Sequence, residues 1–106
     1  LDVVQPDAAL ATGVSGAMEV AAAADRRGMS FVPHTWTNGV GFAANLHVLT
    51  AAGSPWCEFP MEPPWTPDVR DFFLQGTLTH EDGTVRAPDR PGLGVELDRS
   101  AITGAS

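Results

Sequence analysis

The 106-residue sequence contains no lysine, and all six of its basic residues are arginine. This excludes a P-loop lysine, a Schiff-base lysine and a polybasic patch. Thirteen acidic residues bring the net charge to −7. Such a charge argues against contacts with a phosphate backbone, so we expect no nucleic-acid partner.

Cysteine and long apolar runs are also scarce. The single cysteine, Cys57, excludes an internal disulfide framework and any multi-cysteine zinc or iron–sulfur site. No apolar run approaches the ~18 residues that a membrane-spanning helix needs, and no basic segment at the start indicates a signal peptide. We therefore expect one cytoplasmic domain with no membrane partner.

The residues that are present alternate between strand-like and helix-like patterns. Short apolar runs at 2–5, 29–32 and 56–59 predict strands, and a proline follows each of them. Helical spacing of apolar residues predicts helices at 14–27 and 39–52, each with a glycine at its end. Such an order predicts parallel strands joined by right-handed crossovers.

The pattern changes after residue 60, where closely spaced prolines prevent a long helix or strand. We expect a brief helix at 68–74, a hairpin at 77–86, a turn-rich exit at 89–94 and an extended run at 95–98. Arg70 and Asp71 are expected to form a solvated turn.

The predicted elements do not close a sheet. Three parallel strands and a hairpin leave both sheet edges open, whereas mainly parallel sheets normally lie buried under helices. The sequence also begins within a strand and without methionine. We therefore expect an α/β fold, the C-terminal segment of a (β/α) TIM-type barrel, with its last three βα units and a return hairpin. The alternative is a small self-sufficient α/β domain.

A chemically active side chain lies at the C-terminal end of each expected strand: Asp7, His34 and Glu58. In an α/β barrel such positions line the active site. Asp7 could bond the His34 imidazole, fix its tautomer and leave the other ring nitrogen as a general base or acid. Glu58 could hydrogen-bond a substrate oxyanion if burial beside other carboxylates kept it protonated. We expect these three residues to be catalytic.

Each assignment has a structural alternative. Asp7 could cap the following turn, His34 could be a packed loop histidine, and Glu58 could pair with an arginine. The common place of all three in successive units favours the catalytic interpretation. His47 is expected to be packed in its helix, and His80 is expected to be solvated.

Two tryptophans are candidate substrate-binding residues. Trp36 and Trp65 lie in loops at the same end as the candidate catalytic residues, where they could instead only pack the loops. Cys57 precedes Glu58 in its expected strand and so would face the helices as a core thiol. The three histidines are too scattered for a zinc motif.

The ordered motifs resemble the enolase superfamily, and specifically the C-terminal third of the mandelate racemase/muconate lactonizing enzyme group. The resemblance is carried by Gln5-Pro6-Asp7, Pro33-His34, Ala43-Ala44-Asn45-Leu46-His47, Glu58-Phe59 and Pro91-Gly92-Leu93-Gly94-Val95. It implies a divalent-metal-dependent enzyme that abstracts the proton α to a carboxylate, with Mg²⁺ bound by carboxylates upstream of this segment.

The resemblance further implies a His34–Asp7 base dyad and a Glu58 that hydrogen-bonds the substrate carboxylate. We expect an acid-sugar dehydratase; a racemase or epimerase, a lactone cycloisomerase and a non-catalytic binding module are the alternatives. Residues 1–75 would belong to the catalytic barrel, and residues 76–106 would return to an N-terminal capping domain. The expected partners are a small carboxylate substrate, the rest of the barrel and its cap, and further copies in a homo-oligomer. The segment alone is expected to be inactive.

Overall fold

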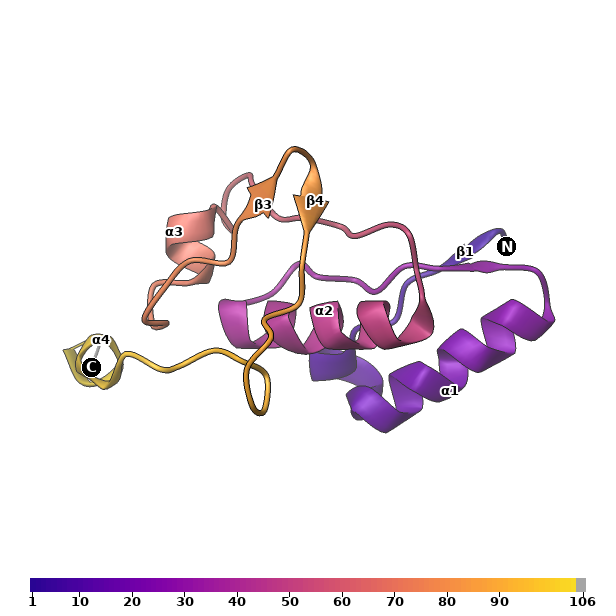
Figure 1. Cartoon of the computed structure of the whole chain (residues 1–106), viewed down its shortest axis with the longest axis horizontal. Coiled ribbons are helices and arrows are strands. Elements are labelled where there is room, and N and C mark those ends of the chain that lie inside the picture. Colours follow the sequence, from indigo (N-terminus) through magenta and orange to yellow (C-terminus); the bar gives the residue numbers. More distant parts are fainter. Residues whose placement is uncertain (105–106) are drawn as a thin grey trace.

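The computed structural model describes residues 1–104 and confirms the alternation of strands and helices in the first half of the chain (Figure 1). The elements are β1 (Val3–Val4), a π-helical turn η1 (Ala8–Thr12), α1 (Gly13–Arg26), β2 (Ser30–Phe31), α2 (Gly39–Ala52), α3 (Pro67–Arg70), β3 (His80–Glu81), β4 (Thr84–Val85) and α4 (Arg99–Gly104). The α/β fold is thus present, with η1 and α4 as elements that the sequence did not predict.

β1 and β2 pair in parallel, and their pairing continues beyond the short strands. Amide groups of the β2 segment donate to carbonyls of the β1 segment at every second residue. These bonds are Ser30 N to Asp2 O (2.9 Å), Val32 N to Val4 O (3.1 Å) and His34 N to Pro6 O (3.1 Å). The constant register carries the pairing past two prolines and brings the residues that follow them side by side.

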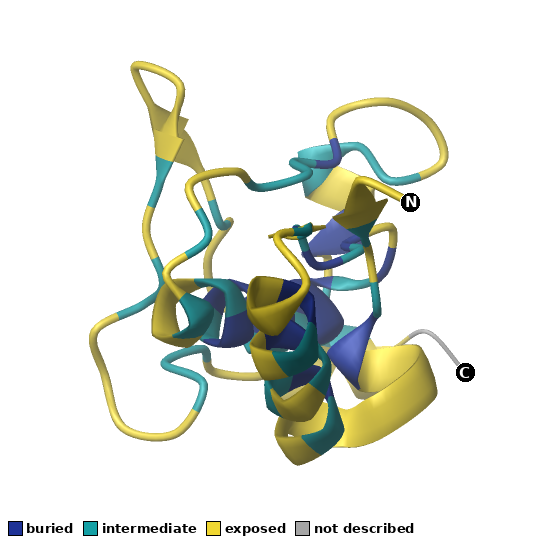
Figure 2. Cartoon of the chain, turned by 90° about the vertical axis from the view of Figure 1, so that its right-hand side faces the viewer, coloured by how far each residue is buried: buried dark blue, intermediate teal, exposed yellow. Residues whose placement is uncertain are grey.

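The core lies where α1 packs against β2 and α2. Ala17, Ala21 and Ala24 recur every three or four residues, so they share one buried face of α1. Their small side chains let the backbones approach closely, and Ala8, Phe31 and Val48 complete the buried cluster. Figure 2 shows the buried residues gathered along the helices, while the hairpin is exposed.

The two long helices end at the predicted glycines, and the start of α2 has a cap that was not predicted from the sequence. Asn38 caps α2, because its Oδ1 accepts hydrogen bonds from the amides of Val40 (3.1 Å) and Gly41 (3.0 Å). Gly28 and Gly53 follow α1 and α2 with φ of 65° and 69°, a left-handed conformation that glycine adopts without steric cost.

The third expected strand, at 56–59, is not formed in the structure. Among the described residues this segment pairs with no strand, so the parallel sheet has two strands where the sequence predicted three. Hydrogen bonds from Thr35 to Glu58 and from Arg70 to the adjoining Pro60 hold the segment instead. The helix expected at 68–74 covers only Pro67–Arg70. Asp71 follows as its C-cap residue, with its backbone amide bonded to the carbonyl of Pro67.

Arg70 and Asp71 do not form the solvated turn that we expected. Their side chains are 0% and 1% exposed and form an ion pair. The physical reason is that an ion pair can enter an interior when its partners satisfy both charges, a condition that local sequence does not reveal.

The hairpin is shorter than the predicted 77–86. His80 pairs with Val85 and Glu81 with Thr84. The two turn residues between them, Asp82 and Gly83, have φ of 49° and 74°, as a two-residue turn between antiparallel strands requires. Figure 1 shows this hairpin over α2, and α4 at the end of the molecule opposite β1.

Candidate active site

Asp7 and His34 lie next to each other where β1 and β2 end. His34 Nδ1 is 3.2 Å from Asp7 Oδ2. The side chain of His34 is 39% exposed, whereas that of Asp7 is only 6% exposed. The imidazole is therefore accessible to a ligand, while the carboxylate that orients it is shielded from water.

The two oxygens of Asp7 have different partners. Oδ1 accepts hydrogen bonds from the amides of Ala9 (2.8 Å) and Leu10 (3.3 Å) at the start of η1. Oδ2 is left for His34. Asp7 thus caps the following turn and also binds the imidazole. The cap and the contact with His34, which the sequence offered as alternatives, are therefore both made by this side chain.

Asn45 completes the surroundings of Asp7. This side chain is fully buried in α2, and its Nδ2 donates to Asp7 Oδ1 (3.0 Å) and to the carbonyl of Gly41 (3.1 Å). Its Oδ1 accepts from the Ala8 amide (2.9 Å). This role of Asn45 was not predicted from the sequence. The sequence signal for this role was an asparagine among apolar residues of the helix. An amide in such a position is buried and must have hydrogen-bond partners.

The charge state of Asp7 results from these contacts. Burial alone would raise the pKa of the Asp7 carboxyl, but hydrogen bonds from Asn45, His34, Ala9 and Leu10 favour the ionised form and hold its pKa below the usual value. An ionised Asp7 requires a hydrogen on His34 Nδ1. The neutral imidazole then carries its lone pair on Nε2, the atom that can accept a proton.

Glu58 is brought to this site through Thr35, the residue after His34. Glu58 Oε2 accepts a hydrogen bond from the Thr35 amide at 2.7 Å. The Thr35 hydroxyl donates to the Glu58 carbonyl oxygen and lies 3.4 Å from Oε2. This role of Thr35 was not predicted from the sequence. None of the ion pairs within residues 1–104 includes Glu58, so pairing with an arginine is not observed.

The two candidate substrate-binding tryptophans lie outside this hydrogen-bond network. Trp36 is exposed in the loop between β2 and α2, and Trp65 is half-buried before α3. In the part of the chain that the structure describes, neither tryptophan bonds to or stacks on Asp7, His34 or Glu58.

The remaining two histidines and the cysteine have structural rather than catalytic contacts. His47 is half-buried with Nε2 3.0 Å from the Leu93 carbonyl oxygen, and His80 is exposed with its ring edge-on to Phe59, so both predictions are confirmed. Burial, followed by the negative charge of Glu58, raises the pKa of the half-buried Cys57 thiol to about 11. Such a thiol is not a nucleophile at neutral pH.

Residues 1–104 contain no group of three or more histidine, cysteine, aspartate or glutamate side chains that could hold a metal ion. The described residues therefore do not fit a metal centre. No helix within the same residues has the length and apolar character needed to cross a bilayer.

Comparison with known proteins gives the chain its family. The family model described as enolase C-terminal domain-like matches residues 1–101. The chain belongs to the enolase C-terminal domain-like family. Solved structures of mandelate racemase/muconate lactonizing enzymes confirm the predicted relation to that group.

Two curated relatives of this enolase-like domain are sugar-acid enzymes. An arabinonate dehydratase from Saccharolobus solfataricus is 34% identical over 97 residues, which are 92% of this chain and 25% of that protein. A D-galactarolactone cycloisomerase from Agrobacterium fabrum is 36% identical over 97% of this chain and 29% of that protein. The chain thus spans roughly a quarter of the length of these relatives.

Solved structures agree with this assignment. A predicted mandelate racemase from Rhodobacter sphaeroides matches with a TM-score of 0.81 and 30% identity, over 96% of this chain and 26% of that one. A mandelate racemase/muconate lactonizing enzyme from Jannaschia sp. CCS1 matches with a TM-score of 0.76 and 28% identity, over 97% and 26% of the two chains.

Proposed function

We propose that this chain is the C-terminal part of a (β/α) barrel in a divalent-metal-dependent acid-sugar dehydratase. Residues 1–75 would complete the catalytic barrel, and residues 76–106 would return to a capping domain. The observation that carries the proposal is the His34–Asp7 contact of 3.2 Å at the ends of two parallel strands. The similarity to an arabinonate dehydratase supports the choice of reaction.

In this proposal His34 is the general base. Its Nε2 accepts the proton α to the substrate carboxylate, while Nδ1 keeps its hydrogen bond to Asp7. The buried, ionised Asp7 stabilises the imidazolium that forms. The same imidazolium then returns the proton to the departing β-hydroxyl, so that one C–H bond and one C–O bond break and water leaves.

Glu58 would stabilise the other end of the substrate. The Glu58 carboxyl would hydrogen-bond a substrate carboxylate oxygen as negative charge moves onto it during enolisation. Hydrogen bonds to Thr35 keep this group beside the backbone of the base. Trp36 and Trp65 are proposed to line the substrate pocket.

The family resemblance also leads us to propose Mg²⁺ dependence. Because residues 1–104 do not fit a metal centre, we place the Mg²⁺ ligands in the part of the barrel that this chain does not span. The rest of the barrel, the cap, an acid-sugar substrate and further copies in a homo-oligomer are the proposed partners. A cytoplasmic location remains part of the proposal.

Lactone cycloisomerisation is the second candidate, supported by the 36% identity to D-galactarolactone cycloisomerase. It shares the removal of the α-proton with dehydration and differs in the fate of the resulting carbanion. Racemisation and epimerisation likewise share this step, whereas a non-catalytic binding module would not use the dyad.

The test is a screen of the intact protein, with Mg²⁺, against a panel of sugar acids and their lactones. Formation of a dehydrated keto acid by the wild type, and its loss in His34→Asn, would support the first candidate. Isomerised lactone as the only product would support the second. Absence of both α-proton exchange and turnover with every sugar acid and lactone would overturn both candidates.

A further inference from the structure

Arg70, the last residue of α3, is buried beside the segment that carries Glu58. Its guanidinium makes a two-pronged ion pair with Asp71, from Nε to Oδ1 at 2.8 Å and from Nη2 to Oδ2 at 2.6 Å. The pair is not the solvated turn expected from the sequence, and the proposed mechanism does not use it. A fully buried arginine close to a catalytic segment needs an explanation of its own.

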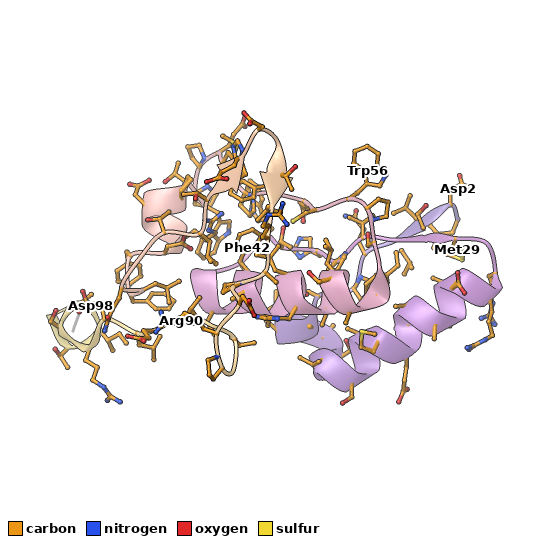
Figure 3. The ribbon with its side chains drawn as sticks, in the orientation of Figure 1. Asp2, Met29, Phe42, Trp56, Arg90 and Asp98 are labelled. Atoms are coloured by element: carbon orange, nitrogen blue, oxygen red, sulfur yellow. The ribbon has the colours of Figure 1, made fainter. Side chains whose placement is uncertain are left out.

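The other contacts of Arg70 reach three parts of the chain. Nη1 donates to the carbonyl of Pro60 at 3.3 Å, and Nη2 donates to the carbonyl of Leu78 before the hairpin. Its Cζ lies 4.4 Å from the ring centre of Phe42 and 5.0 Å from that of Phe59. The rings of Phe42 and Phe59 also meet edge to face. Phe42 is labelled on α2 in Figure 3.

Asp71 joins the cluster to the start of α2. A Cβ atom on Gly39 would lie only 2.5 Å from Asp71 Oδ1, so the close approach requires glycine at this position. Asp71 Oδ2 also accepts from the Leu78 amide at 2.8 Å. Both charges are therefore satisfied inside the protein, and the pair fixes α2, α3 and the base of the hairpin relative to one another.

Among the described residues, the segment 58–60 pairs with no strand, and contacts from two other segments hold it. Thr35 bonds Glu58 at one end of the segment, and Arg70 bonds Pro60 and stacks on Phe59 at the other. Replacing a buried ion pair with apolar residues often costs no stability, so its best attested use is to specify geometry.

We propose that Arg70 is a positioning residue for Glu58. By holding Phe59 and Pro60 against α2, Arg70 sets where the Glu58 carboxyl lies relative to His34. The inference rests on the proposed role of Glu58 and deepens it. Arg70 touches no substrate and acts only through the Glu58–Pro60 segment.

The test is a double-mutant cycle in the intact protein, combining Arg70→Lys with Glu58→Ala. Lysine keeps the charge but lacks the planar fork that bonds Asp71 and Pro60 together. Because misplacing a catalytic group by about 1 Å can cost on the order of a hundredfold in rate, we expect Arg70→Lys to lower kcat by ~10- to ~100-fold. In the Glu58→Ala background we expect no further loss, since the group being positioned is absent.

The exposed Arg90–Glu96 ion pair supplies a matched control. Its side chains are 61% and 52% exposed, and Arg90→Lys should leave kcat unchanged. Phe59→Leu removes the ring on which Arg70 stacks and should show the same coupling to Glu58→Ala, so the cycle can be completed if Arg70→Lys does not fold. Losses that multiply in both double variants would overturn the positioning role alone. A Glu58→Ala protein with wild-type kcat would overturn the proposed role of Glu58 itself.

Discussion

Asn45 provides the sharpest prediction about the architecture of the site. The change to alanine removes its hydrogen bonds to the carboxylate of Asp7 (3.0 Å) and from the amide of Ala8 (2.9 Å). The site is fully buried, so water has little room to replace the amide. Asn45→Ala should therefore destabilise the fold and also disturb the charge of Asp7.

The expected size comes from the two contacts. A hydrogen bond to a charged group contributes about 1.5–3 kcal/mol, and leaving the buried Ala8 amide without a partner costs about 1–3 kcal/mol. Alanine recovers about 0.5 kcal/mol through its higher helix propensity. We expect a loss of about 3 kcal/mol in the free energy of unfolding. The pKa of Asp7 should rise, because burial is then opposed by fewer hydrogen bonds.

Asn38→Ala is the matched control, since it removes an asparagine that caps the same helix but does not contact the dyad. It should cost about 1 kcal/mol and leave the pKa of Asp7 unchanged. Urea unfolding and NMR titration of labelled aspartate in the intact protein measure both quantities. A cost for Asn45→Ala no greater than that for Asn38→Ala, or an unchanged Asp7 pKa, would refute the reasoning.

Two further predictions concern buried charge and pH. Asp71→Asn leaves the Arg70 cation without its counter-charge and should lower the free energy of unfolding by about 3–5 kcal/mol. Removal of the exposed partner by Glu96→Gln should cost less than ~1 kcal/mol, and equal losses in urea unfolding would contradict the burial argument. The pKa of Asp7 lies below 3.8 in the folded protein, so its stabilising contribution is complete above pH 3.8 and disappears as the pH falls through the lower folded value. Stability measured below pH 3.8 should thus depend less on pH in Asp7→Asn than in the wild type, and identical pH profiles would count against this linkage.

Local patterns in the sequence predicted the two long helices and the parallel pairing. The separation of 27 residues between Asp7 and His34 equals the offset between β1 and β2, so repeat spacing indicated that the two side chains would meet. The glycines that end the two long helices, Gly28 and Gly53, were likewise predicted, because a left-handed residue after a helix is a local feature.

Contacts between distant segments were not predictable in this way. The segment at 56–59 has the composition of a strand, yet long-range bonds from Thr35 and Arg70 hold it without strand pairing within the described chain. The burial of Arg70 depends on rings and carbonyls from three separate segments, and no local rule brings them together. The support of Asp7 by Asn45, across 38 residues, has the same origin.

The central claim is that His34, held by Asp7, removes the proton α to a sugar-acid carboxylate. The most direct test is the incorporation of solvent deuterium at the α-carbon of a substrate identified in the screen, comparing the intact wild type with His34→Asn. Our account predicts incorporation or turnover in the wild type and loss of both in the variant, with metal binding retained because His34 belongs to no metal-binding group among residues 1–104. A His34→Asn protein that exchanges the α-proton and turns over at the wild-type rate would contradict it.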